Sequence, residues 1–161
     1  MEDLKLYLQE SASRKLLHVE NALLDSLRNE LPDYAGIYFV FVGKASRDEN
    51  GFRMSKPRLI YIGEAKDIND RHNNEDGTPK HEHYKDFASY LQDGESIAYA
   101  FAPVNNGPFT RKLIESALIY HFQPPINIKS KYSFSHRRTI INITSNKEFP
   151  YNGEIIVEEA K

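Results

Sequence analysis

Five polar residues of this chain have side chains that together could hydrolyse a phosphodiester. Such a reaction needs a base for the attacking water, a cation for the phosphate oxygens, a carboxylate that holds a metal, and a donor that positions the substrate. Tyrosine, arginine, glutamate and asparagine can supply these functions in that order. The candidates are Tyr38, Tyr61, Arg71, Glu115 and Asn127.

Most of these residues also have an ordinary structural explanation. A tyrosine inside a strand usually packs with its ring half-buried, and an arginine on a surface helix is usually a solvated charge. Glu115 is different, because it lies in LIESALIYHF beside apolar residues at neighbouring helical positions. A carboxylate there must be paired, hydrated or metal-bound, since burying it bare is costly. Asn127 follows two prolines, where an asparagine commonly caps a turn.

Two strands must position the tyrosines. GIYFVFV at 36–42 and LIYIG at 59–63 are rich in β-branched and aromatic residues, which predicts strands. The polar segment between them contains Gly and Pro, which predicts a long hairpin loop. Two strands joined in this way are most simply antiparallel.

The alternation of side chains along these strands places each tyrosine on a defined face. Tyr38 shares its face with Val40, and Tyr61 shares its face with Leu59 and Gly63. We therefore expect the two phenols to lie on one common face if the hairpin pairs in a suitable register.

The rest of the chain predicts helices around a small sheet. Helices are expected at 3–31 (as one helix or two), 66–74, 81–92 and, capped by Thr110, at 111–122. Further strands are expected at 96–104 and in the tail pieces RTIINIT and EIIVEE. The predicted fold class is α+β: a small domain with a mostly antiparallel sheet, an extra N-terminal helix and a C-terminal β tail.

Two tripeptides suggest a known family. GIY at 36–38 and YIG at 61–63 resemble the two signature motifs of the GIY-YIG nucleases. Arg71 stands ten residues after Tyr61, where that family has its arginine. RKLIESALIYHFQPPIN resembles the family's later block, in which a helical glutamate is followed by an aromatic-proline stretch and an asparagine. The motifs together span about 36–128, well over half of the chain.

The resemblance implies a three-stranded, mixed or antiparallel central sheet flanked by helices. It also implies hydrolysis of DNA by activated water with one divalent cation, Mg²⁺ or Mn²⁺, held by Glu115. It makes Tyr38 the general base or its hydrogen-bonding partner, and Tyr61 the residue that orients the water or the scissile phosphate. Arg71 would stabilise charge developing on the phosphate, and Asn127 would be a structural or phosphate-positioning amide.

The tyrosine base needs help from a positive charge. A phenol with a pKa near 10 is a poor base at neutral pH. The bound metal, or a nearby cation such as Lys66 or Arg71, must therefore favour the phenolate.

This chain departs from the family pattern at one histidine. Many members carry a histidine one helical turn after the arginine, whereas Glu75 stands there in this chain. The candidates to replace it are His72, His81 and His83, of which His81 and His83 are favoured. The structural alternative is that these are exposed histidines on a helix.

The segment between the tripeptides is also longer than is usual in the family, with 22 residues. Its basic residues could reach DNA, and they are Lys44, Arg47, Arg53, Lys56 and Arg58.

Composition excludes several classes of protein. The chain has 161 residues, 40% of them apolar, which suits one globular domain. It has no cysteine, which excludes disulfide frameworks, thiolate zinc sites and thiol nucleophiles. No apolar run is long enough for a membrane span, and the acidic start lacks the apolar core of an export signal. We therefore expect a cytoplasmic protein.

Charge is unevenly distributed along the chain. The formal net charge is −2, yet one segment after the last predicted helix is basic. It contains two aromatic residues together with Lys129, Lys131, Arg137 and Arg138. Such a patch can bind the phosphates of DNA, and the alternative is a solvated loop.

The predicted organisation has three parts. They are an N-terminal helical extension at 1–32, a GIY-YIG-like nuclease core at 33–128, and a basic segment with a β tail at 129–161 packed on the same domain. A compact nuclease that acts alone or as a homodimer fits this plan. The rival hypothesis is a non-catalytic module that keeps the fold to bind nucleic acid or a protein, supported by Glu75 and the negative net charge. A purely structural domain would require all five motif elements to coincide by chance.

Overall fold

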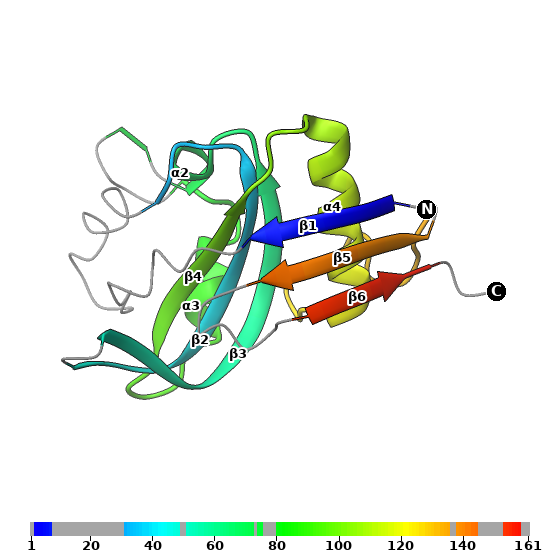
Figure 1. Ribbon diagram of the computed structural model, residues 1–161. Helices are drawn as coiled ribbons and strands as arrows, with labels where there is room; N and C mark the ends of the chain where they lie inside the picture. The colour runs from blue at the N-terminus through cyan, green and yellow to red at the C-terminus, as the bar shows by residue number, and fades with distance from the viewer. Residues whose placement is uncertain are drawn as a thin grey trace.

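The structure is a computed structural model that describes residues 2–7, 31–48, 51–72, 74–75, 80–135, 138–144 and 153–158 (Figure 1). Its elements are β1 (Glu2–Tyr7), β2 (Gly36–Asp48), β3 (Gly51–Ala65), α2 (Ile68–His72), α3 (Tyr84–Ser89), β4 (Ser96–Pro103), α4 (Pro108–Phe122), β5 (Thr139–Thr144) and β6 (Gly153–Val157). The predicted α+β architecture with a three-stranded antiparallel sheet is confirmed.

The central sheet has β2 in its middle. The strand order is β3-β2-β4, and β2 pairs antiparallel with both neighbours. Residues 36–43 are all buried, because packed layers cover both faces of β2. This burial explains why GIYFVFV is a continuous apolar run and does not alternate with polar residues.

A bulge in the hairpin corrects one predicted face. Tyr38 pairs with Gly63 and Val40 pairs with Tyr61, but Phe41 pairs with Leu59, so that the register shifts at Ile60. Leu59 consequently packs against the opposite hydrophobic cluster from Tyr61, and the prediction that they share a face was wrong. An extra residue on one strand changes the face of every side chain beyond it.

The predicted hairpin loop is largely a two-stranded ribbon. Pairing between β2 and β3 continues from Lys44 opposite Ser55 as far as Asp48 opposite Gly51. Gly and Pro in this segment suggested a loop, but the neighbouring strand supplies backbone partners that local propensity does not reveal.

The first two helices are shorter than predicted. α2 covers Ile68–His72 of the expected 66–74, and the Asp70 N–H donates to the Asp67 side chain at 2.9 Å. α3 covers Tyr84–Ser89 of the expected 81–92.

The third helix begins earlier than predicted. α4 starts at Pro108, with Gly107 at its N-cap, so Thr110 is inside the helix and does not cap it. Proline suits the first helical position because no partner exists there for the missing N–H. The helix ends at Gln123 in the left-handed conformation, just before Pro124.

The N-terminal residues are the clearest error of prediction. Residues 3–7 were expected to be helical, but they belong to β1, which pairs in parallel with β5. The remainder of the predicted helix, 8–30, lies outside the described residues. The strands predicted in the tail are confirmed as β5 and β6, and they complete a second three-stranded sheet with β1.

Two hydrophobic clusters cover the two faces of the central sheet. On one face, α4 and the second sheet pack against side chains such as Phe39, Phe41 and Ile62 (Figure 1). On the other face, Tyr38 and Tyr61 pack with side chains from α2 and α3. Within the described ranges, no helix has the length and apolar character needed to cross a membrane.

Candidate active site

The two signature tyrosines lie together on one face of the central sheet. The Tyr38 and Tyr61 ring centroids are 6.1 Å apart. Tyr38 is 1% exposed and Tyr61 is 9% exposed, so Tyr61 is the ring closer to solvent. Their common face follows from the antiparallel register of β2 and β3.

The glycines of the two tripeptides provide space for close contacts. A Cβ at Gly63 would lie 2.3 Å from the Tyr38 hydroxyl oxygen, because the Tyr38 ring lies directly over this position. A Cβ at Gly36 would lie 2.1 Å from the Ala102 carbonyl oxygen of β4. Any side chain at Gly63 would therefore displace Tyr38 from its place.

His81 holds the Tyr38 hydroxyl. Its Nε2 lies 2.7 Å from the Tyr38 oxygen, and its Nδ1 accepts the backbone N–H of His83 at 3.0 Å. A neutral imidazole has one donor and one acceptor nitrogen. Since Nδ1 is the acceptor, Nε2 carries the proton and donates it to the oxygen of Tyr38.

His72 forms the wall behind Tyr38. Its ring meets the Tyr38 ring edge-on at 4.4 Å and stacks on His81 at 4.8 Å. Nδ1 donates to the Ile68 carbonyl at 2.9 Å, while Nε2 is buried without a hydrogen-bond partner within the described part of the chain. The sequence favoured His81 and His83 over His72 and did not predict that the His72 ring is buried against Tyr38.

Both of these histidines are neutral at physiological pH. Burial lowers the pKa of His72 to about 4. Burial, reinforced by the nearby His72, lowers the pKa of His81 to about 2. Tyr38 is therefore surrounded by uncharged imidazoles.

The phenols are protonated in this state. Burial raises the pKa of Tyr38 well above its ordinary value, and the charge of Arg71 acts in the opposite direction. Burial and the nearby Glu115 raise the pKa of Tyr61 to about 12, which Arg71 again opposes. A positive charge close to these oxygens is consequently needed to form a phenolate.

Glu115 is a partly buried carboxylate close to a second one. Burial and the charge of Glu64 raise the pKa of Glu115 to about 7. Glu64 itself is paired with the buried Arg111, whose Nε lies 3.0 Å from Oε2. Sequence reasoning missed this pair, although Glu64 directly follows YIG and Arg111 precedes Glu115 by about one turn of the same helix.

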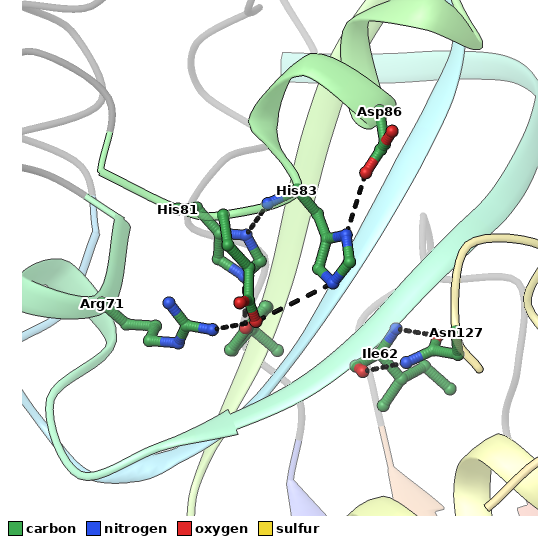
Figure 2. Close-up of polar contacts among 8 residues, drawn as sticks. Ile62, Arg71, His81, His83, Asp86 and Asn127 are labelled. Atoms are coloured by element: carbon green, nitrogen blue, oxygen red, sulfur yellow. Dashed lines mark hydrogen bonds and ion pairs between the residues drawn. The ribbon is translucent and has the colours of Figure 1, made fainter. Parts of the chain in front are cut away.

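Arg71 lies close enough to act on the whole group. Its charge affects the pKa of Tyr38, Tyr61 and Glu115. Its Nη2 lies 2.9 Å from Oε1 of Glu82. Figure 2 marks this ion pair with a dashed line from Arg71. Glu82 is 66% exposed, so this ion pair lies at the solvent-facing side of the group.

The Asn127 side chain forms hydrogen bonds with the protein backbone. Its Oδ1 accepts the Ile62 N–H at 2.9 Å, and its Nδ2 donates to the Ile62 carbonyl at 2.8 Å (Figure 2). Next to it, the Ile126 N–H donates to the Ile60 carbonyl. The Asn127 amide thus replaces a neighbouring strand along the edge of β3. Of the two expected roles, this geometry agrees with the structural one.

The other auxiliary candidates are Lys66 and His83. Lys66 is exposed, and the positive charge that affects the pKa of Tyr38 is that of Arg71 and not that of Lys66. The His83 ring lies 5.1 Å from the Tyr61 ring, and its Nδ1 donates a hydrogen bond to Asp86 Oδ2 at 2.9 Å. His83 therefore borders the site, but His81 is the histidine that touches Tyr38.

The predicted basic segment lies between α4 and β5. Lys129 is exposed and Lys131 is half-buried. Arg138 Nε lies 3.6 Å from a carboxylate oxygen of Glu158 in an exposed ion pair. Arg137 lies outside the described residues.

The donor set suits a hard divalent cation with a small protein contribution. In the described ranges, no three His, Cys, Asp or Glu side chains gather into a group that could enclose a metal. Mg²⁺ commonly binds through one or two carboxylates while water and substrate phosphate complete its shell. Glu115, with Glu64 nearby, is compatible with such a site, and a cation there would offset the cost of ionising Glu115.

Comparisons with known proteins add no assignment: no protein-family model, curated protein or solved structure significantly matches this chain.

Proposed function

We propose that this protein is a metal-dependent endonuclease of the GIY-YIG type that hydrolyses phosphodiester bonds in DNA in the cytoplasm. One observation carries the proposal. Tyr38, Arg71 and Glu115 come from separate elements, yet the charges of Arg71 and Glu115 both affect the pKa of the Tyr38 hydroxyl. A buried phenol held by a histidine beside a raised-pKa carboxylate is costly for a purely structural core.

In this proposal, Glu115 holds Mg²⁺ or Mn²⁺, which supplies Lewis-acid stabilisation of the phosphate when it is bound. Glu64 is kept from competing by its ion pair with Arg111, whose Nε is 3.0 Å away. Glu115, whose pKa is raised to about 7, is therefore the carboxylate whose ionisation a bound cation would favour.

In this proposal Tyr38 first loses its phenol proton to solvent, and the resulting phenolate acts as the general base that takes a proton from the attacking water. The N–H of His81 points at the Tyr38 oxygen, so it stabilises negative charge there. The neutral His81 ring cannot accept the Tyr38 proton at Nε2, because that nitrogen already carries one. His81 is thus a positioning residue for the phenolate. Arg71 lowers the pKa of Tyr38 without overcoming the effect of burial, and a cation held by Glu115 would add further positive charge.

Arg71 also binds the scissile phosphate in this proposal. Its present partner Glu82 is exposed, and exposed ion pairs are weak. A phosphate oxygen can therefore take the place of the Glu82 carboxylate. Tyr61, the less buried phenol, then orients the water or the phosphate.

The test is cleavage of plasmid DNA by purified protein in Mg²⁺ or Mn²⁺. We expect nicking or linearisation that Glu115→Gln reduces by about a thousandfold or more, corresponding to several kcal/mol of barrier. Glu75→Gln is the matched control, because Glu75 is an exposed glutamate and its loss should leave the rate unchanged. The proposal would be contradicted if neither Mg²⁺ nor Mn²⁺ supported cleavage, or if Glu115→Gln still cleaved DNA at the native rate.

The second candidate is a binding module without catalysis. It is favoured by the raised pKa values of both Tyr38 and Tyr61, which keep the phenols protonated. This alternative predicts salt-dependent DNA binding that Glu115→Gln leaves intact and no cleavage by the native protein.

A further inference from the structure

Two apolar side chains protrude from one short loop after α4. Ile128 is 79% exposed and Tyr132 is 85% exposed, the highest values among the large hydrophobic residues that the structure describes. A single exposed apolar residue is common on protein surfaces. Two within residues 128–132, with lysines between them, form an apolar and basic surface that we call the 128–132 loop.

The loop is held in place by its backbone and its short polar side chains. Ser130 Oγ donates to Ser116 Oγ of α4 at 3.2 Å, and the Gln123 side chain donates to the Lys131 carbonyl. Ser130 has a φ of 65°, an unfavourable conformation for a residue with a side chain. The loop is therefore braced while Ile128 and Tyr132 are left uncovered.

Both ends of the loop are anchored in the core. Asn127, 7% exposed, pairs with Ile62, which stands between Tyr61 and Gly63 in β3. At the other end, Phe134 follows the loop and is buried, with 1% of its surface exposed. Because Asn127 directly precedes the loop, Ile128 protrudes from the surface close to β3, the strand that carries Tyr61.

The charges of the loop suit a polyanion. Lys129 is exposed, Lys131 is half-buried, and neither forms an ion pair with a carboxylate among the described residues. Lysines of this kind bind phosphates without regard to sequence. Aliphatic side chains beside such contacts act as wedges between base pairs, and tyrosine rings stack on unpaired bases.

We infer that the 128–132 loop is a DNA-distorting element: Ile128 enters the base stack beside the scissile phosphate, and Tyr132 stacks on the base that is released. This inference rests on the proposed function and names its substrate class as DNA with unstacked bases. Lys129 and Lys131 hold the flanking phosphates. A bulged duplex, whose base is already unstacked, is then bound more tightly than a perfect one.

The inference is tested by DNA binding in EDTA, which prevents cleavage. Fluorescent duplexes that carry 2-aminopurine at successive positions report unstacking of a base. We expect a fluorescence increase at one position with the native protein and its loss in Ile128→Ala and Tyr132→Ala. Each variant should bind the bulged duplex about 5- to 100-fold more weakly than the native protein. Both side chains are mostly exposed, so the variants should fold normally.

Two controls separate stacking from charge. Lys131→Ala should reduce the slope of log affinity against log salt by about one, whereas Tyr132→Ala should leave that slope unchanged. Ile156→Ala removes an apolar side chain that is 43% exposed on β6, and it should change neither binding nor fluorescence.

The outcomes distinguish this inference from the proposed function. Native binding without a fluorescence increase, or unchanged binding by Tyr132→Ala, overturns the loop inference and leaves the nuclease proposal intact. Failure of the native protein both to bind and to cleave DNA overturns both.

Discussion

The two faces of the central sheet are equally buried but chemically different. The face beneath α4 and the second sheet is an apolar core of aliphatic and phenylalanine side chains. The opposite face buries groups that can titrate, and they are Tyr38, Tyr61, Tyr99, His72 and His81. The contrast is sharpest inside β2, where Phe39 and Tyr38 are neighbours that are 0% and 1% exposed.

This difference indicates a division of labour. Burial of apolar side chains stabilises a fold in proportion to the area removed from water. Burial of a polar atom without a partner, such as Nε2 of His72, costs free energy. The apolar face therefore supplies stability that offsets the cost of burying the titratable groups on the other face, which we propose to serve catalysis.

The largest predicted effect separates the two neighbours in β2. Phe39→Ala should lower the free energy of unfolding by about 3–5 kcal/mol, because it leaves a cavity in the apolar core. Tyr38→Phe removes one oxygen and leaves the buried Nε2–H of His81 without its acceptor, so it should cost about 1–3 kcal/mol of stability, less than Phe39→Ala. It should lower cleavage by about 10²–10⁴-fold. Urea unfolding and plasmid cleavage of both variants provide the measurements.

The opposite pattern would contradict this contrast between Phe39 and Tyr38. Loss of cleavage in a folded Phe39→Ala protein, or full cleavage by Tyr38→Phe, would show that the faces do not divide stability from chemistry in this way.

The next effect concerns pH and only the titratable face. The folded pKa of His72 is about 4 and its unfolded value is about 6.5, so the unfolded state binds a proton first as the pH falls. Stability due to neutral His72 is thus fully present above about pH 6.5 and is lost progressively down to about pH 4. His72 alone should contribute a loss of about 2 kcal/mol between pH 7.5 and pH 5, and the buried His81, whose pKa is lowered further, adds to it.

Urea midpoints at pH 7.5 and pH 5 measure this loss. His72→Phe should show a smaller difference between the two pH values than the native protein, even if it is less stable at both. A native difference retained in full by His72→Phe would rule out this buried histidine as its source.

The smallest effect lies at the edge of the titratable face. Glu82→Gln removes the exposed partner of Arg71, so the substrate phosphate no longer competes with a carboxylate. We expect KM for DNA to fall by at most about fivefold, since exposed ion pairs contribute little. Asp70→Asn removes an exposed carboxylate that pairs with Lys80, and it should change KM less. An increase of KM in Glu82→Gln would show that Glu82 positions Arg71 and does not compete for it.

Parts of the fold could be predicted because their patterns are local. The apolar run from Gly36 and the run ending at Gly63 predicted a hairpin, and the helix around Glu115 follows from its apolar spacing. The extended ribbon and β1 could not be predicted, because only pairing with another strand makes these segments extended. Helix ends were wrong by several residues where no strong cap fixes them.

The same division holds for the candidate site. The types and order of Tyr38, Tyr61, Arg71 and Glu115 are properties of the sequence, and they alone suggest phosphodiester chemistry. Only the tertiary structure decided which histidine touches Tyr38, because His81 reaches it from a distant part of the chain. It also decided that Asn127 bonds to Ile62, because hydrogen bonds between distant residues depend on packing that no local pattern encodes.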